Sequence, residues 1–371
     1  MRRPAKQRSA ARRSFAAGFR NANPLVLVAA AGLLVLFLLG VQSFVTSFVT
    51  SGAYTRAISQ DELLRRISDD WGRVSWQVGH LKQSPPKLPA VYLLGGSTAR
   101  ELITSEASFA AAIRQTTGVQ VYVNDLASMN QSFGQSLAIA ANLPPRDAVL
   151  IIGVNYGRFT ASPGDNEDQI VGRPLLLQSA DLRTYVADAY GRYKYAFTIL
   201  PGIMSYIVSW AHEGADELRA GHIPTHVFDT HRYSLRTQLP LKRKELLVQK
   251  WLRTRAPKFT KNYDYNAAML EELVRVAKRR GFTVVLLDLP LNETVIGDRF
   301  KDVVDRYRAL CRRLAAQYGV ISMDPLPRAR LTNGDFQDLA HLVEPGRVKF
   351  EHALAAELAG VLATGVGGTT P

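Results

Sequence analysis

Ser97 has the sequence context of a nucleophilic serine. It follows an apolar run typical of a buried strand, then Gly95 and Gly96, and it stands directly ahead of a predicted helix. Free backbone N–H groups and the helix dipole favour an anion at such a turn. Ser97 is therefore a candidate nucleophile; the alternative is that it only caps the helix, since serine is among the commonest N-caps.

A carboxylate and an imidazole that suit this serine lie near the other end of the chain. Asp338 stands three residues before His341, in a predicted loop ahead of the last helix. Such an aspartate can hold one imidazole nitrogen, which fixes the tautomer and leaves the other nitrogen to accept a serine proton. The sequence therefore predicts a triad of Ser97, His341 and Asp338; the alternative is an exposed Asp/His pair without a role.

Two further turns offer donors for a developing oxyanion. Asn155 follows a predicted strand, and its side-chain amide can donate to negative charge beside the backbone N–H of Ser97. The alternative for Asn155 is a loop residue that hydrogen-bonds to its own backbone. The turn after the second predicted strand consists of small polar residues, and the family resemblance described below implies that it supplies a third donor, from Asn130, Ser128 or Met129.

Short apolar runs alternate with amphipathic stretches, which predicts the elements that position these residues. Continuous apolar strands separated by helices indicate a parallel sheet covered on both faces, and ligands bind at the carboxyl ends of such strands. The predicted strands are 91–94, 119–123, 148–152, 283–287 and 320–323. The predicted helices are 99–115, 131–142, 266–280, 298–318 and 345–362.

An insertion, expected at about 160–263, interrupts this alternation. Its uncharged stretch 195–210 has Pro201 in the middle and is too short for a second confident membrane span. We expect buried helical pieces there, or else an apolar surface that rests on lipid or on a membrane partner. The insertion also holds histidines at 212, 222, 226 and 231. Pro224 keeps two of them off a shared helical face, and no metal site is expected.

A basic tail precedes a long apolar stretch at the N-terminus. Residues 1–23 hold no acidic residue, and no charge occurs from 21 to 55. Since about 20 apolar residues cross a bilayer core, residues 24–49 are predicted to span a membrane. Lys and Arg beside a span stay in the cytoplasm, which places the rest of the chain outside. The alternatives are a signal peptide cleaved near Ser51 and a tail that binds nucleic acid.

Composition sets the remaining limits. The 371 residues are 47% hydrophobic, which excludes a wholly disordered chain. Cys311 is the single cysteine, so an internal disulfide framework and a Cys-rich metal site are excluded, and the residue is expected to be packed in a helix. Lys and Arg number 46 against 32 Asp and Glu, and the net charge is +14. This excess makes an acidic partner worth considering.

The domain organisation follows from these patterns. A membrane-proximal stalk is expected at 50–88, with helical spacing in its first part and a Pro-Pro break at its end. The folded domain is expected at 89–364 and a flexible tail at 365–371. Asp288 and Asn292 follow the fourth predicted strand, where they either line the cleft or belong to a structural turn.

The chemistry-bearing segments together resemble the SGNH/GDSL hydrolase family. Gly96-Ser97-Thr98 is similar to the nucleophile block, although that family usually has Gly-Asp-Ser. Asn155 is similar to its oxyanion asparagine, and the segment from Asp338 to His341 to its Asp-x-x-His block. The resemblance implies a three-layer α/β/α sandwich with a parallel, flavodoxin-like sheet. It further implies a serine esterase or acyltransferase that needs no cofactor.

The resemblance covers about residues 89–158 and 265–362. An anchored, outward-facing domain with this nucleophile segment looks most like the cell-envelope acyl-transfer branch, the DltD-like and alginate-acetylation-like proteins. That likeness implies an envelope polysaccharide or other acyl-bearing polymer as substrate and a polytopic membrane O-acyltransferase as partner. It implies the cytoplasmic or inner membrane of a bacterium as the location, and no nucleic-acid partner.

Two other functions remain open at this point. The same fold and cleft suit a non-catalytic module that binds glycan or scaffolds an envelope complex. They also suit a lipase-like hydrolase that meets lipid through its apolar insertion. The distance between Ser97 and His341 is the first observation that separates catalysis from binding alone.

Overall fold

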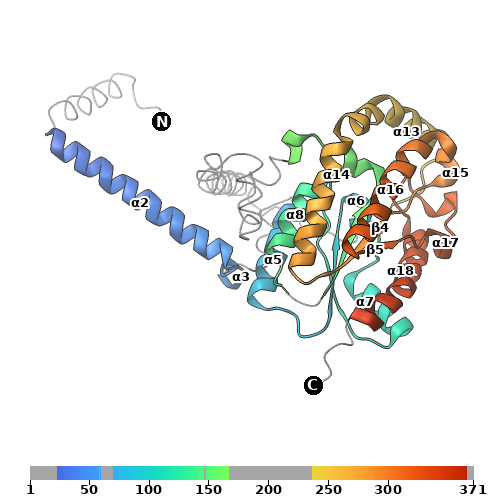
Figure 1. Ribbon diagram of the computed structural model, residues 1–371, viewed down its shortest axis with the longest axis horizontal. Helices are drawn as coiled ribbons and strands as arrows, with labels where there is room; N and C mark the ends of the chain where they lie inside the picture. Colours follow the sequence, from blue (N-terminus) through green and yellow to red (C-terminus); the bar gives the residue numbers. More distant parts are fainter. Residues whose placement is uncertain (1–22, 58, 60–69, 146–147, 167–235, 366–371) are drawn as a thin grey trace, which may run out of the picture. The chain divides into compact units, whose positions relative to one another are not determined.

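The computed structural model describes residues 23–57, 59, 70–145, 148–166 and 236–365 (Figure 1). The chain divides into two units, Met1–Phe48 and Val49–Pro371, which are treated separately below. The predicted basic tail, the apolar stretch 195–210 and the histidines of the insertion lie outside the described residues.

The first unit contains most of helix α2 (Pro24–Thr50). Asn23 begins this helix by accepting a hydrogen bond from the backbone N–H of Leu25 at 2.9 Å. Its segment Pro24–Phe44 has a mean hydropathy of 2.7, and none of it is buried against protein. Among the described helices it alone has the length and apolar composition of a membrane span, features that a signal sequence shares.

The second unit is built on a five-stranded sheet in which every pair of neighbours is parallel. The strands, in spatial order, are β2 (Tyr122–Asp125), β1 (Ala90–Leu94), β3 (Ala148–Val154), β4 (Thr283–Asp288) and β5 (Ile321–Met323). The order 2-1-3-4-5 occurs in doubly wound α/β proteins. The sequence prediction of a parallel α/β sheet is confirmed.

Helices cover both faces of this sheet (Figure 1). Alternate side chains of β1 enter different cores: Tyr92 and Leu94 join one buried cluster, and Val91 and Leu93 join the other. The first core is closed by α5 (Asp70–Gln83), α8 (Phe133–Asn142), α13 (Leu241–Thr254), α14 (Ala256–Arg279) and α16 (Lys301–Tyr318). The second core is closed mainly by α7 (Glu106–Thr117) and α18 (Glu344–Gly365).

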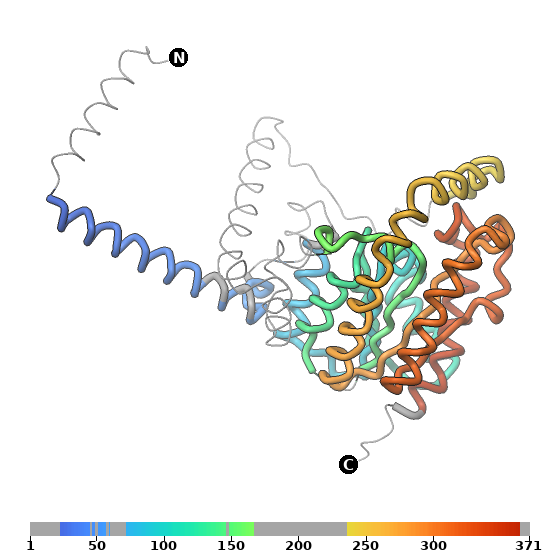
Figure 2. Tube along the Cα trace, turned by 45° about the horizontal axis from the view of Figure 1, so that its top comes forward, coloured from blue at the N-terminus to red at the C-terminus, as the bar shows by residue number. Residues whose placement is uncertain are grey.

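Short elements complete the second unit. They are α3 (Tyr54–Ala57), α6 (Ser97–Arg100), α15 (Glu293–Ile296) and α17 (Leu326–Ala329), with the 3-10 helices η1 (Tyr156–Thr160), η4 (Gly297–Phe300) and η5 (Asn333–Asp335). Helix α14 runs alongside α8 (Figure 2). Cys311 lies on the buried side of α16 in the first core, which agrees with the packing role expected for it.

Local capping moves two of the predicted boundaries. The helix predicted at 99–115 is two helices, α6 and α7, because Ser105 caps α7 by accepting a hydrogen bond from the Ser108 N–H at 3.0 Å. Strand β2 begins at Tyr122 rather than at 119. Gly118 ends α7 in the left-handed conformation with φ of 75°, and residues 119–121 belong to no regular element before the strand begins.

The stalk and the insertion both contribute to the domain itself. Helix α5 lies within the range expected to be a stalk, yet Val74, Val78 and Leu81 are at most 1% exposed in the first core. Helix α13 and the first turns of α14 lie within the expected insertion, and they close the same core. Helix α14 begins at Ala256, not near 266, because Phe259 and Tyr263 in the added length pack against Phe159 of η1.

Candidate active site

The turn that carries Ser97 depends on a glycine at the end of β1. Gly95 has φ of 155°, and a Cβ built on it would lie 2.5 Å from the Cβ of Ala99. Its N–H donates to the side-chain oxygen of Gln131 at 2.9 Å. The chain therefore turns sharply into α6, of which Ser97 is the first residue. The first N–H groups of a helix have no partner within it, so the helix itself does not use the backbone N–H of Ser97, the expected oxyanion donor.

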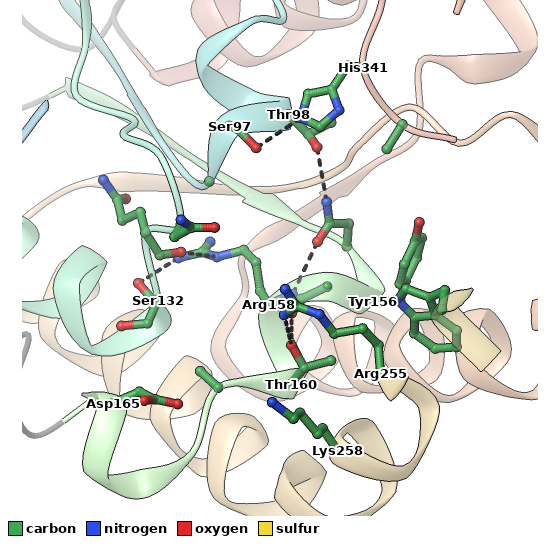
Figure 3. A pocket seen from close by; sticks show the side chains of 18 residues that line it. Ser97, Thr98, Ser132, Tyr156, Arg158, Thr160, Asp165, Arg255, Lys258 and His341 are labelled. Carbon is green, nitrogen blue, oxygen red and sulfur yellow. Dashed lines mark hydrogen bonds between the residues drawn. The ribbon is translucent and has the colours of Figure 1, made fainter. Parts of the chain in front are cut away.

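His341 lies within hydrogen-bonding distance of both Ser97 and Asp338. The Ser97 Oγ is 2.9 Å from His341 Nε2 (Figure 3). His341 Nδ1 is 2.8 Å from Asp338 Oδ2. An ionised carboxylate only accepts hydrogen bonds, so Nδ1 carries the proton and Nε2 accepts from the serine hydroxyl. The geometry is that of a serine, histidine and aspartate triad.

Hydrogen bonds behind the histidine hold Asp338 in place. Its Oδ1 accepts the backbone N–H groups of Ala340 and His341, both at 2.9 Å. The side chain of Asn292, which is 1% exposed, donates to the Asp338 carbonyl oxygen at 3.1 Å. Asn292 also donates its backbone N–H to the carbonyl of Leu339 at 2.9 Å. Asn292 therefore holds the loop that carries Asp338 and does not line the cleft.

The electrostatics of the pair favour a charged aspartate and a basic imidazole. Burial by itself raises the pKa of Asp338. The hydrogen bond and the charge of the His341 side chain, together with hydrogen bonds from two backbone N–H groups, outweigh burial and lower this pKa to about 2. Burial by itself lowers the pKa of His341, but the hydrogen bond and charge of Asp338, with the charge of Glu101, raise it above its ordinary value. Because the imidazole gains basicity in this way, it is suited to accept a proton from Ser97.

A cleft of about 630 Å³ opens beside Ser97 and His341. It is lined by all the predicted oxyanion residues, since Asn130 and Asn155 also face it. The lining as a whole is about equally polar and apolar. Its apolar part includes the rings of Tyr156 and Trp251, and its polar side chains are those of Thr98, Gln131, Ser132, Arg158, Thr160, Asp165, Arg255 and Lys258. Figure 3 shows Asp165 and Lys258 at the end of the cleft opposite His341.

Asn155 is oriented by its own local structure. It caps η1, with its Oδ1 accepting the Arg158 N–H at 3.2 Å. The opposite side of the amide, Nδ2, lies 3.4 Å from Thr98 Oγ1, next to the nucleophile. The cap thus fixes which end of the amide faces Ser97. Asn130 is exposed and has a left-handed φ of 55°, at the turn that follows β2.

Gln131 and Arg158 are parts of this site that sequence reasoning did not single out. The Gln131 side chain donates to the Leu126 carbonyl and accepts the Gly95 N–H, both at 2.9 Å. Arg158 is buried, and its guanidinium donates to the carbonyl groups of Gly153 and Ser132 at 2.6 and 2.9 Å. Burial lowers the Arg158 pKa to about 9. These two side chains join the ends of β1, β2 and β3; the sequence offers no local signal for contacts between such distant segments.

Other candidate residues lie elsewhere. Asp288 binds Tyr307 and Arg308, at 2.7 and 2.5 Å, and does not line the cleft. Burial, opposed mainly by Arg308, raises the Asp288 pKa to about 6. Within the described part of the chain, no cluster of three or more His, Cys, Asp or Glu side chains is arranged to hold a metal ion.

No protein-family model matches this chain, and no curated protein matches it either. A serine hydrogen-bonded to an imidazole, which is hydrogen-bonded in turn to a carboxylate, is suited to nucleophilic attack on an acyl carbon.

Proposed function

We propose that this protein is a membrane-anchored serine acyltransferase or esterase of SGNH type. The observation that carries the proposal is the pair of contacts at His341: 2.9 Å from Nε2 to Ser97 Oγ and 2.8 Å from Nδ1 to Asp338 Oδ2. The helices on both faces of the sheet suit the three-layer α/β/α sandwich of that family. So does the position of Ser97 at the carboxyl end of β1.

The proposed reaction passes through an acyl-enzyme. Ser97 Oγ attacks the acyl carbon of an ester or thioester while its proton moves to His341 Nε2. The negative charge on the carbonyl oxygen is stabilised by the backbone N–H of Ser97 and the side-chain amide of Asn155, with Asn130 as the candidate third donor. When the tetrahedral intermediate collapses, the leaving group takes the proton from His341. Asp338 stays ionised and stabilises the imidazolium throughout.

The second half of the reaction repeats these steps in reverse order. An incoming hydroxyl gives its proton to His341 and attacks the acyl carbon, and Ser97 is released as the alcohol. The charged and hydrogen-bonding side chains along the cleft suit a hydrated, hydroxyl-bearing acceptor. Hydrogen bonds to such an acceptor can come from Thr160, Arg255 and the exposed Lys258. Arg255 Nη1 lies 3.3 Å from Thr160 Oγ1. We therefore favour an envelope polysaccharide or other acyl-bearing polymer over a lipase substrate.

The proposed location is the cytoplasmic or inner membrane of a bacterium. Helix α2 would be the single span, with the basic tail in the cytoplasm and the catalytic domain on the other side. An acyl group has to cross the membrane to reach such a site, so a polytopic membrane O-acyltransferase is the proposed partner.

A fluorophosphonate probe tests the nucleophile, because it reacts covalently with activated serines. The full-length protein should be labelled, and Ser97→Ala should not. Ser322→Ala is the matched control, since Ser322 is exposed on β5 and does not line the cleft. If Ser97→Ala is labelled as fast as the unaltered protein, Ser97 is not the nucleophile.

A second assay separates the candidate activities. Short acyl esters are supplied to the full-length protein with and without a carbohydrate acceptor. Acylated carbohydrate indicates transfer, and release of free acid alone indicates an esterase. A protein that binds the carbohydrate but neither releases nor transfers acyl groups is the non-catalytic module.

A further inference from the structure

A buried carboxylate lies close behind the nucleophile helix. Glu101 is the residue that ends α6, one turn after Ser97, and it is 2% exposed. Its Oε1 lies 2.9 Å from an Nη2 atom of Arg236. Glu101 is not a lining residue of the cleft, and the triad described above does not use it.

Arg236 connects this carboxylate to the loop that carries the base. Its Nη1 donates to the side-chain oxygen of Gln337 at 2.7 Å. Gln337 directly precedes Asp338, and its backbone N–H donates to the His341 carbonyl at 2.8 Å. One guanidinium therefore joins the helix that begins with Ser97 to the loop that contains Asp338 and His341.

The backbone of the same segment reinforces this connection. Leu239 donates its N–H to the Gln337 carbonyl at 2.9 Å, and the Gln238 side chain donates to the Asn333 carbonyl at 3.2 Å. Further along, Lys244 is buried and donates to the carbonyl groups of Asn333 and Phe336 at 2.9 and 2.8 Å. The segment that begins at Arg236 thus contacts the triad loop repeatedly.

We propose that Arg236 and Glu101 are positioning residues of the triad. They form a clasp, defined as the Arg236 guanidinium with the Glu101 carboxylate and the Gln337 side chain, that fixes the Ser97 helix relative to the His341 loop. Glu101 also places a second negative charge near the imidazole, beyond the one supplied by Asp338. This inference rests on the proposed function, because it assigns a role within that same site.

The charges around the imidazole have opposing effects. The charges of Asp338 and Glu101 raise the pKa of His341, and the charge of Arg236 lowers it. Burial raises the pKa of Glu101 itself, opposed by the charges of His341 and of nearby guanidinium groups. Those groups belong to Arg236, Arg347 and Arg100. Removing Glu101 and removing Arg236 should therefore shift the His341 pKa in opposite directions.

The clasp is accessible to mutation because its arginine is not a core residue. The Arg236 side chain is 25% exposed, so its loss opens no large cavity. Arg236→Met keeps the length of the side chain and removes the bridge. Arg236→Lys keeps the charge but cannot hold both partners with one planar group. Glu101→Gln is isosteric and removes only the negative charge.

The test is the pH dependence of fluorophosphonate labelling and ester turnover by the full-length protein. Arg236→Met should lower kcat about tenfold, as a small misplacement of reacting groups does, with little change in KM. The acid limb of the pH–rate profile should move to higher pH in Arg236→Met and to lower pH in Glu101→Gln. Arg236→Lys should restore part of the lost kcat. Arg328→Met is the matched control, since the Arg328–Glu357 pair at 2.9 Å is exposed and distant from the cleft.

The outcomes separate the clasp from the proposed function. If the unaltered protein is labelled and both variants keep its rate and its pH profile, the clasp is wrong and the triad stands. If the unaltered protein is not labelled, the proposed function fails. The imidazole NMR titration of His341 then still tests the clasp, because opposite shifts in the two variants support it and unchanged titrations overturn it.

Discussion

At the scale of single residues, the proposed chemistry depends on the two nitrogens of one imidazole. His341 faces a carboxylate through Nδ1 and a hydroxyl through Nε2. The contact at Nδ1 decides which nitrogen carries the proton, and hence whether Nε2 can accept one from Ser97. Asp338 therefore affects the reaction through the tautomer of His341.

Asp338→Asn should leave the fold intact and remove most of the activity. An asparagine can donate its amide N–H to Nδ1, which moves the imidazole proton to Nε2, where it blocks acceptance from Ser97. By analogy with serine proteases, we expect kcat to fall by roughly a thousandfold or more. The rate of fluorophosphonate labelling measures the effect, and circular dichroism serves as the check on folding. A variant that reacts within tenfold of the unaltered protein would argue against this role of Asp338.

The acid limb of the pH dependence should follow the protonation of His341. Its pKa is raised above the ordinary 6.5, and the imidazole must be neutral to act as a base. Activity should therefore fall as pH decreases through a midpoint above 6.5. Asp338, with a pKa of about 2, stays charged over that range and adds no second step. A kcat/KM profile with its acid limb at or below 6.5 would contradict the electrostatic account.

The motif residues of the site could be predicted from the sequence because each sits at a recognisable local signal. Ser97 follows a glycine turn, and Asp338 and His341 are three residues apart. Glu101 and Arg236 carry no such signal. Their importance arises from contacts across the fold, which spacing along the chain does not encode.

At the scale of elements, the turn between β1 and α6 controls where Ser97, the proposed nucleophile, points. Gly95 allows that turn because its missing Cβ would meet Ala99 at 2.5 Å. The strands themselves were predictable because buried parallel strands are continuous apolar runs. The helix ends and the role of α5 were harder to predict, because capping decides the first and tertiary packing the second. Val74 and Val78, for example, become core residues only once α5 meets the sheet.

Gly95→Ala should therefore destabilise the domain and displace Ser97. The new methyl group clashes with Ala99, and a backbone conformation that disfavours side chains adds strain of about 1–3 kcal/mol. The melting temperature and the labelling rate should both fall. Gly96→Ala is the matched control for stability, since a Cβ there meets nothing closer than the Gln131 carbonyl oxygen at 3.9 Å. Equal melting temperatures for the two variants would show that Gly95 is not required for the turn.

At the scale of the whole molecule, the proposal needs the catalytic domain on the non-cytoplasmic side of a membrane. Helix α2 and the basic residues before it support that orientation, but the same helix would fit a signal sequence. The sequence predicted the presence of this helix from composition alone. Its final role depends on the cell's processing machinery, which neither composition nor fold encodes.

Cysteine labelling in intact cells can test the orientation. The single native cysteine, Cys311, is buried, so it gives little background. Ser322→Cys should react with a membrane-impermeant maleimide from outside, provided the outer envelope is made permeable. Ser9→Cys, in the basic tail, should react only after the cytoplasmic membrane is opened. Reaction of both sites in the same compartment would rule out a single span, and absence of Ser9→Cys from the mature protein would indicate cleavage.

The central claim is that Ser97 forms a covalent acyl-enzyme, and mass spectrometry of the protein isolated rapidly from native membranes tests it most directly. Trypsin should release residues 88–100, a peptide that contains Ser97 and Thr98 as its only hydroxyl residues besides Tyr92. The account predicts an acyl mass on this peptide, located at Ser97 by fragmentation, and accumulating when acceptor is withheld. An acyl group on Thr98 or on another peptide, with Ser97 unmodified under the same conditions, would contradict it.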